Sequence, residues 1–216
     1  MSATYGDLQS AIARELFNRT DLTTEIQAAI QSAIAHYQKH EFYFSEEQDT
    51  ATTVNGQSSL GLPSDHGWVE GLTIIYSTYP IPMLRRDWLT MQQLYVNSSV
   101  LTGPPTDWAI FADQLWFWPT PNGAYTVTMW QNIQNAAPSA DSDSNNWTVD
   151  AEELIRSRAV ADVRCHVLRD PPALQEFGLL GPESPFFSKR EHIAYTNLKT
   201  YTAQRIGAGV IKPIDF

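Results

Sequence analysis

The chain has 216 residues, 43% of them hydrophobic and 18% charged, with a formal net charge of −10 and a single cysteine, Cys165. This length and composition exclude global disorder and suit one large domain or two small ones. One cysteine excludes a disulfide within the chain and is typical of a reducing cytosol, and neither a signal peptide nor a membrane-spanning segment of ~20 apolar residues is expected.

The acidic charge is concentrated in the middle of the chain. Residues 46–150 contain 11 acidic and two basic residues, whereas residues 1–45 and 151–216 are close to neutral. Because acidic segments repel phosphate backbones, this distribution disfavours sequence-specific DNA binding.

The first segment is predicted to form two amphipathic helices, over residues 4–17 and about 22–41. Their apolar residues recur at the spacing of one helical face. Asp21 or Thr23 is a candidate N-cap for the second helix. Residues 42–44 then change to the character of a strand. The predicted buried stripes are Leu8, Ile12 and Leu16, followed by Leu22, Ile26, Ile30, Ala33, Ile34 and Tyr37.

The middle segment, about residues 45–147, is predicted to be β-rich. Asn55-Gly56 is a typical hairpin turn between strands at 50–54 and 59–62. Pro80 and Pro82 predict an edge or irregular strand. A short helix is expected over 86–96, with Trp88, Met91 and Tyr95 on one face. Further strands are expected at 68–76, 107–111, 114–118 and 125–133, and an exposed linker at 135–146.

The last segment returns to helix. Thr148 and Asp150 are candidate N-caps, and Glu153 would complete a capping box with Asp150. This helix is expected to run to Arg169 and to stop before Pro171. Further helices are predicted at 173–177 and from Pro185 to about residue 206, with Ser184 as the N-cap.

This order predicts an α+β fold: a discontinuous helical bundle from both chain ends with an inserted, sandwich-like antiparallel β lobe. The bundle would comprise residues 1–44 and 148–206, and the insertion residues 45–147. Residues 207–216 would form an extended C-terminal tail, because Gly207 and Gly209 end the last helix and Pro213 fixes an extended backbone.

All seven tryptophans lie between residues 68 and 147. They would fill the core of the β lobe, since aromatic residues favour strands, or form an exposed surface for a partner. The second interpretation gives an alternative function, a carbohydrate-binding or host-adhesion module of a phage tail. Its candidate partner-facing aromatics are Trp108, Trp116, Trp118 and Trp130.

No catalytic constellation is recognisable, so no enzyme and no cofactor is predicted. His36 and His40 are four residues apart on a helix, a spacing that can bind a metal, but no third ligand is indicated. Cys165 and His166 are adjacent and would point in different directions, which favours a buried structural thiol. Acidic pairs such as Glu152-Glu153 would instead stabilise the first turn of a helix.

Several segments at the two ends of the chain together resemble the head-to-tail adaptor (connector) proteins of short-tailed bacteriophages. The resemblance covers both helical ends, while the middle matches in its character as a β insertion. The segments that carry it are Thr4-Tyr5-Gly6-Asp7-Leu8, Ile12-Ala13-Arg14-Glu15-Leu16, Arg19-Thr20-Asp21-Leu22, residues 26–37, Phe42-Tyr43-Phe44-Ser45-Glu46, Leu154-Ile155-Arg156-Ser157-Arg158-Ala159 and residues 207–216.

The resemblance implies a structural virion protein of the phage neck, assembled in the host cytoplasm. Twelve subunits would form a ring that bridges the portal protein to the tail nozzle or fibres, with DNA passing through the lumen. Acidic residues facing the lumen would keep DNA from sticking. A ring needs two different faces on each subunit, which the helices at 22–41 and 150–169 could supply.

The C-terminal tail is the candidate docking segment for the portal or for a neighbouring subunit. Its apolar residues have near-alternate spacing, which suits strand addition or insertion into a groove, although the tail could also fold back on its own bundle. The candidate docking residues are Ile211, Lys212, Pro213, Ile214, Asp215 and Phe216.

Overall fold

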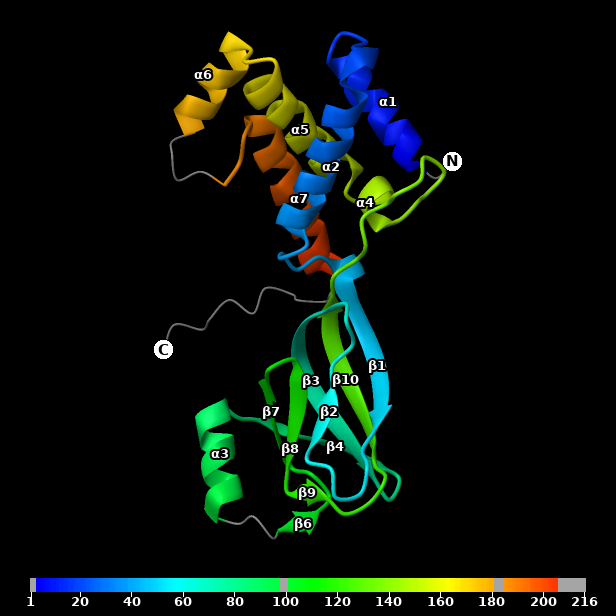
Figure 1. The fold of residues 1–216 in the computed structure, drawn as a ribbon, viewed down its shortest axis with the longest axis vertical. Coiled ribbons are helices and arrows are strands. Elements are labelled where there is room, and N and C mark those ends of the chain that lie inside the picture. Colours follow the sequence, from blue (N-terminus) through cyan, green and yellow to red (C-terminus); the bar gives the residue numbers. More distant parts are fainter. Residues whose placement is uncertain (1–2, 98–100, 181–184, 206–216) are drawn as a thin grey trace. The chain divides into compact units, whose positions relative to one another are not determined.

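The computed structural model describes residues 3–97, 101–180 and 185–205. The chain forms two compact units (Figure 1). Residues 1–44 and 135–216 belong to the first, here the helical unit, and residues 45–134 form the second, the β unit. Helices together with mainly antiparallel sheets confirm the predicted α+β class. The β unit was predicted to be antiparallel, but two of its short strand pairs are parallel.

Six α-helices make up the described part of the helical unit. The predicted helix over 150–169 is divided: α5 ends at Asp162, and one π-helical turn, Val163–Val167, follows it. The predicted stop before Pro171 holds, since residues 168–170 are not helical. The next helix begins at Pro171 rather than at residue 173, because the missing N–H of proline costs nothing at a first helical position. The six are α1 (Tyr5–Glu15), α2 (Thr23–Tyr37), α4 (Asn146–Val149), α5 (Glu152–Asp162), α6 (Pro171–Leu180) and α7 (Lys189–Arg205).

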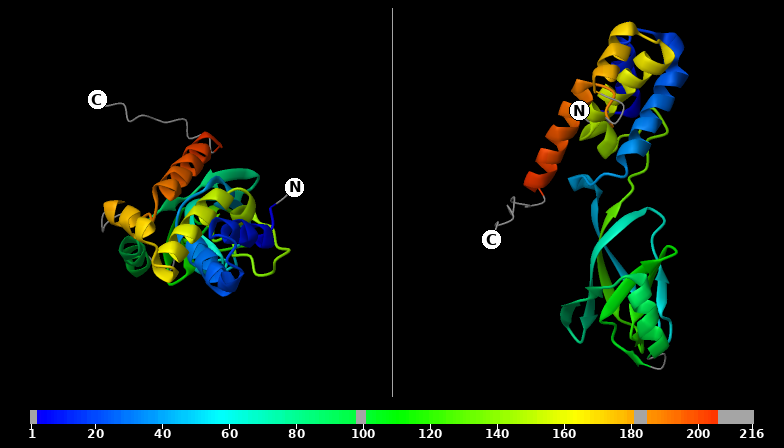
Figure 2. Two further views of the ribbon diagram at one scale, coloured as in Figure 1. Left: turned by 90° about the horizontal axis from the view of Figure 1, so that it is seen from above. Right: turned by 90° about the vertical axis from the view of Figure 1, so that its left-hand side faces the viewer.

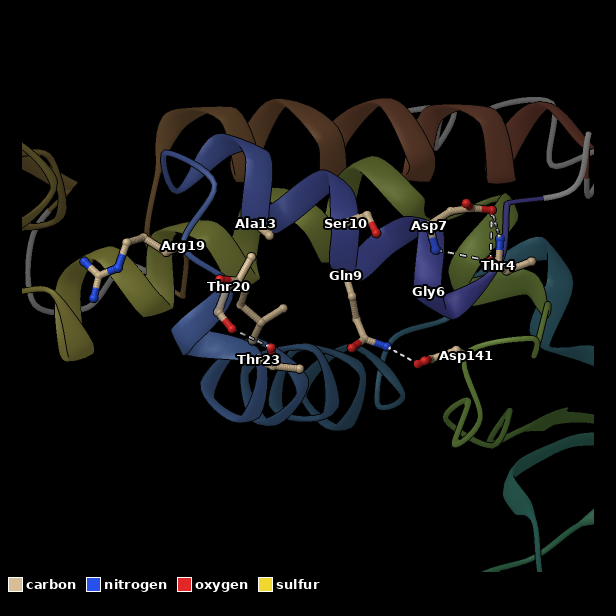
Figure 3. A pocket seen from close by; sticks show the side chains of 11 residues that line it. Thr4, Gly6, Asp7, Gln9, Ser10, Ala13, Arg19, Thr20, Thr23 and Asp141 are labelled. Atoms are coloured by element: carbon tan, nitrogen blue, oxygen red, sulfur yellow. Dashed lines mark hydrogen bonds between the residues drawn. The ribbon is translucent and has the colours of Figure 1, made fainter.

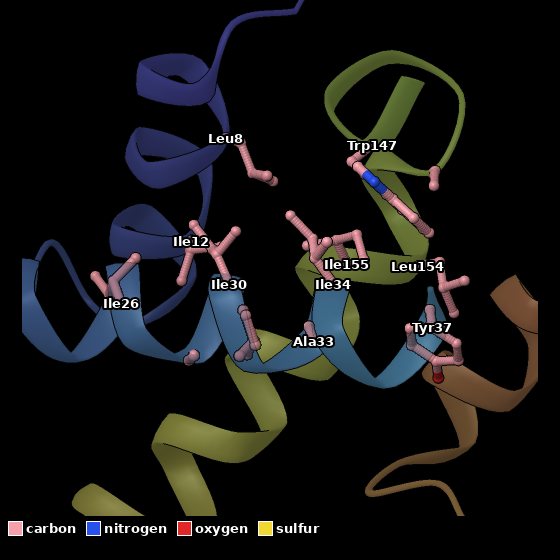
Figure 4. Close-up of a cluster of buried hydrophobic side chains, with 14 of the residues drawn as sticks. Leu8, Ile12, Ile26, Ile30, Ala33, Ile34, Tyr37, Trp147, Leu154 and Ile155 are labelled. Carbon is pink, nitrogen blue, oxygen red and sulfur yellow. The ribbon is translucent and has the colours of Figure 1, made fainter. Parts of the chain in front are cut away.

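The core of the helical unit is built from the predicted apolar stripes. All residues of the two predicted apolar stripes are buried. They include Leu16, directly after α1, and Leu22, directly before α2. Figure 4 shows Ile30 of α2 beside Ile12 of α1, and Ile34 of α2 beside Ile155 of α5. Ala33, 1% exposed, adds little bulk to this contact, so α2 and α5 can pack closely.

Three predictions at helix ends are wrong. Neither Asp21 nor Thr23 caps α2, because its N-cap position is Leu22, which makes no side-chain cap hydrogen bond. Asp150 does not cap α5; instead Asn145 and Thr148 form a capping box at the start of α4. Residues 43–45 form a 3₁₀ turn rather than a strand. Burial explains this turn, because Phe42 is fully buried and its ring packs edge-on against Trp147.

Residues 135–145 form no helix or strand and are largely exposed, as predicted for a linker. They belong to the helical unit, whereas the β insertion was expected to continue to residue 147. The first backbone N–H groups of a helix lack partners within it. Here the Tyr5 and Gly6 N–H groups donate to the Asp143 and Asp141 carbonyls, at 2.8 and 2.9 Å. The Gln31 side chain also donates to the Pro138 carbonyl at 2.8 Å. The segment therefore satisfies the start of α1.

The described part of the β unit contains two four-stranded sheets, a two-stranded pair and one helix, α3 (Trp88–Asn97) (Figure 2). Sheet 1 is antiparallel with the order β1-β10-β3-β4, and its strands are β1 (Glu46–Thr52), β3 (His66–Tyr76), β4 (Tyr79–Pro82) and β10 (Thr126–Ile133). Sheet 2 has the order β2-β8-β7-β5, with β2 (Ser59–Gly61), β5 (Leu84–Arg85), β7 (Asp107–Phe111) and β8 (Gln114–Trp118). The pair is β6 (Thr102–Gly103) and β9 (Thr120–Pro121).

The core of the β unit lies between the inner faces of sheets 1 and 2, since alternate residues of a strand point to opposite faces. Met91 of α3 is fully buried, and Trp88 stacks on Phe111, so α3 covers the outer face of sheet 2. The buried core residues are Val69, Leu72, Ile74, Met83, Trp108, Leu115, Phe117, Val127 and Met129.

The predicted hairpin at Asn55-Gly56 is wrong, although the turn exists. Gly56 has φ +76°, as such turns require. However, β1 pairs with β10 in sheet 1 and β2 pairs with β8 in sheet 2, so the turn joins two different sheets. The prediction for the proline-containing strand holds, because β4, with Pro80 and Pro82, lies at an edge of sheet 1. A true hairpin joins β7 and β8, which are antiparallel neighbours connected through Ala112-Asp113.

Candidate assembly surfaces

A buried polar cluster fixes the last helix to the rest of the helical unit. The Glu191 side chain on α7 has no solvent exposure, and Arg158 on α5 donates to its Oε1 atom at 2.6 Å. The Tyr37 hydroxyl on α2 donates to the same oxygen at 2.6 Å. One carboxylate therefore joins three helices, and burial together with this hydrogen bond raises the pKa of Tyr37 far above its usual value.

The remaining donors of this cluster hold the segment that leads into α7. The Phe187 N–H donates to Glu191 Oε2 at 2.6 Å, and Arg158 also donates to the Pro185 carbonyl at 3.0 Å. The Arg158 guanidinium lies 4.4 Å from the Phe187 ring centroid. Because a buried charge must be fully compensated, this arrangement permits little movement of α7 against α5.

A partly exposed ion-pair network links α1, α5 and α7. Arg190 on α7 donates to Glu15 of α1 at 2.5 Å and to Glu153 of α5 at 2.6 Å. Arg156 pairs with Glu15, Glu152 and Glu153. Exposed pairs contribute little free energy individually. These pairs mainly fix the orientation of the three helices. Together with the buried cluster they hold the helices of the unit in one arrangement.

A groove of about 410 Å³ lies between α1, the start of α2 and the segment around Asp141 (Figure 3). Small side chains, such as Ser10, Ala13 and Thr23, line it. Gln9 donates to Asp141 Oδ1 at 2.8 Å and closes one end, and Arg19 lies at the other end, paired with Asp21. The described residues that line the groove form no catalytic pair.

An uncovered face of α7 is the second surface of the helical unit. Ile193 and Tyr201 are 61% and 47% exposed, and Asn197 lies between them at helical spacing. Shallow hollows flank this row on the sides of α5 and α6. The groove and this row are different in chemistry, as a head-to-tail contact between subunits would require.

The four tryptophans predicted to face a partner do not gather on one surface. Trp108 is buried in the core, 1% exposed. Trp116 and Trp118 lie on the outer face of sheet 2, where Trp116 packs against Trp88 beneath α3. Trp130 is 41% exposed, on sheet 1. The structure therefore does not form the stacking platform that a carbohydrate-binding surface would need.

The predicted docking residues, Ile211–Phe216, lie outside the described residues. The structure shows the end of the helix that precedes them. The Arg205 guanidinium lies 4.6 Å from the Tyr43 ring centroid and 5.7 Å from that of Tyr201, both in the helical unit. The last described residue of α7 is therefore held against the helical unit.

The histidines and the cysteine considered as metal-binding or catalytic candidates make contacts within the helical unit. His36 and His40 have ring centroids 5.7 Å apart, and Nδ1 of His40 is 3.0 Å from the Tyr195 hydroxyl. Burial lowers the pKa of both imidazoles. Cys165 is buried, as predicted, and burial raises the pKa of its thiol. The His166 ring forms a hydrogen bond with the Asp162 carboxylate.

Comparison with known proteins gives one family. The family model described as SU10 adaptor protein matches residues 3–179, a range that includes the whole β unit and the helices α1 to α5. No curated protein matches the chain. Among the described residues, no helix is both long and apolar enough to cross a membrane.

Proposed function

The chain belongs to the SU10 adaptor protein family, a family of structural phage adaptors, and from this we propose that it joins the portal to the tail in the neck of the virion. The observation that carries the proposal is the extent of the match, which spans both units rather than one. The proposed assembly is a ring of identical subunits, twelve in number, between the portal protein and the tail nozzle or fibres.

The contacts of the helical unit support a ring subunit. A subunit in a ring must keep its two contact faces in a fixed orientation, since small errors add up around the ring. The buried cluster of Tyr37, Arg158 and Glu191 fixes α7 against α2 and α5. The row on α7 and the groove beside α1 are therefore displayed by one rigid body.

The acidic charge of the β unit supports passage of DNA through the ring. The β unit contains eight acidic and two basic residues, Arg85 and Arg86. Arg86 is already paired, because its Nε atom donates to Asp107 at 2.7 Å. An acidic lining repels the phosphate backbone, so DNA would slide rather than bind.

Assembly with the portal protein tests the proposal. The purified chain is mixed with the portal protein of the same phage, and particle masses are measured by mass photometry, with rings examined by electron microscopy. We expect a complex with one adaptor chain for each portal subunit. A chain that stays monomeric and ignores the portal would refute the proposal.

The C-terminal tail is proposed to dock onto the portal through its apolar residues. Replacing Ile211 and Ile214 together with serine should weaken portal binding, because both apolar contacts are removed. The matched control is Gln204→Ser, which changes an exposed residue of α7 outside the docking segment. Circular dichroism should be unchanged in both variants. Equal binding by the double variant and the wild type would exclude this role for the tail.

A further inference from the structure

Three rows of paired strands on the outer face of sheet 1 carry no charge, and the acidic residues Glu46 and Glu70 border them beside Trp130. In an antiparallel sheet, residues directly opposite one another point to the same face. The pairing of β1, β10, β3 and β4 therefore places eleven uncharged residues together, five of them threonines. They are Gln48, Trp130 and Gly71 in one row, Thr50, Thr128, Thr73 and Pro82 in the next, and Thr52, Thr126, Ile75 and Pro80 in the third.

Two of these residues are large, apolar and exposed, since Trp130 and Ile75 are each 41% exposed. The β4 edge of this face is closed to a further strand, because Pro80 and Pro82 lack the N–H donors that strand pairing needs. A partner would therefore stack on this face of the sheet rather than extend it at β4.

Helix α3 presents a second uncharged surface on the opposite side of the same unit. Its Trp88, Met91 and Tyr95 point to sheet 2, and Met91 is fully buried. The other side of the helix exposes Leu89 and Val96, at 70% and 81%, with Gln92 and Gln93 between them. Exposed helix faces are usually charged, yet α3 has no charged residue.

These two surfaces lie on opposite outer layers of the β unit. Sheet 2 is between sheet 1 and α3, because its inner face packs on sheet 1 and its outer face is covered by the helix. In Figure 1, α3 is beside β7 and β8, and β1 and β10 are on the other side.

We propose that α3 of one copy packs on the outer face of sheet 1 of the next copy, and that this contact repeats around the ring. The inference rests on the proposed function. The placement of the two surfaces identifies a second copy as the occupant, because they lie on opposite outer layers of one unit. The β units are acidic overall and repel one another, so a contact between them is least opposed where neither surface is charged. Two different faces on opposite sides produce a head-to-tail contact, which can close into a ring.

Charge introduced into either surface tests this contact. Leu89→Glu on α3 and Ile75→Glu on sheet 1 are each expected to raise the protein concentration needed for half-maximal ring assembly on the portal about tenfold or more, since an unpaired charge buried at an interface costs at least the free energy of a tenfold change in affinity. The matched control is Val54→Glu, a 54% exposed position in the connection between the two sheets. This control should assemble like the wild type.

Mixing the two variants tests the head-to-tail geometry. The Ile75→Glu copy retains an intact α3, and the Leu89→Glu copy retains an intact sheet 1, so the mixture can form one intact contact for each pair of copies. We expect mass photometry, without the portal and at a concentration where wild-type copies associate, to show dimers in the mixture that neither variant forms alone. No dimer in the mixture, under conditions where the wild type associates, would overturn the proposal.

Further outcomes separate this inference from the proposed function. If both single variants assemble on the portal like the wild type, the contact is wrong and the adaptor role stands. If the wild type itself forms no ring with the portal, both fail. Urea denaturation checks that the variants fold. Should either be unstable, Gln92→Glu and Thr50→Glu replace exposed polar residues of the same two surfaces and should give the same loss of assembly.

Discussion

Glu191 shows how one residue can fix a whole helix. Its carboxylate is fully buried and receives donors from Arg158, Tyr37 and the Phe187 backbone. Glu191→Gln removes the charge and leaves the Arg158 guanidinium buried without its partner. We expect a loss of about 3 kcal/mol in the free energy of unfolding, measured by urea denaturation. Glu153→Gln is the control, because Glu153 is 48% exposed, and about 1 kcal/mol or less is expected there. Similar losses in both variants would contradict the role of Glu191.

His36 should make the helical unit sensitive to mild acid. Its pKa is lowered, mainly because the imidazole is partly buried and secondly because Arg158 is nearby. The unfolded chain therefore takes up a proton at this residue more readily than the folded chain. Stability is full above the ordinary pKa of 6.5 and falls as the pH drops below that value.

The measurement is the melting temperature at about pH 7.5 and about pH 5.5, on either side of the ordinary histidine pKa. His36→Gln should reduce the drop on acidification, and His66→Gln, in the β unit, serves as the control. An unchanged drop in His36→Gln would show that other groups cause it.

At the scale of the element, the short helix α4 depends on its cap. The Asn145 side chain accepts from the Trp147 and Thr148 N–H groups at 3.0 and 3.2 Å. Asn145→Ala should lower the free energy of unfolding by about 1 kcal/mol, because these two donors lose their acceptor. Asn145→Ser keeps a capping oxygen and should recover most of the loss in urea denaturation. Equal losses in both variants would mean that the cap is not the cause.

Elements were predictable where the signal is local. The stripes of α1 and α2 repeat at helical spacing, and all their predicted residues are buried. The face of α3 formed by Trp88, Met91 and Tyr95 was recognisable for the same reason. Asn55-Gly56 marks a turn correctly, but a turn signal does not specify whether the flanking strands pair. Here each strand finds a better partner from another part of the chain.

At the scale of the whole molecule, each unit has its own core, and core substitutions should act unit by unit. Ile30 in the helical unit and Leu115 in the β unit are 0% and 2% exposed. Replacing either residue with alanine should lower the free energy of unfolding by about 2–5 kcal/mol. Amide hydrogen exchange should show faster exchange mainly in the unit that carries the substitution. Loss of protection spread equally over both units would contradict two separate cores. The two variants serve as each other's control.

The candidate surfaces were only partly predictable. The tail was identified by its apolar spacing, and its docking role stays a prediction. The four tryptophans looked alike in the sequence, but strand direction and sheet order place them on three different faces. The exposed side of α3, with Leu89 and Val96, could not be predicted. The sequence shows which residues are apolar, but it does not show which side of the helix the rest of the protein leaves uncovered.

The sequence by itself determined the order of helices, strands and helices, the buried helical stripes and the edge position of the proline-containing strand β4. These features follow from periodicity and backbone preferences within a few residues. Only the tertiary structure decided the pairing of β1 with β10, the docking of residues 135–146 on α1 and the cluster around Glu191. Each of these joins residues far apart in the chain, whose contacts depend on packing rather than on spacing.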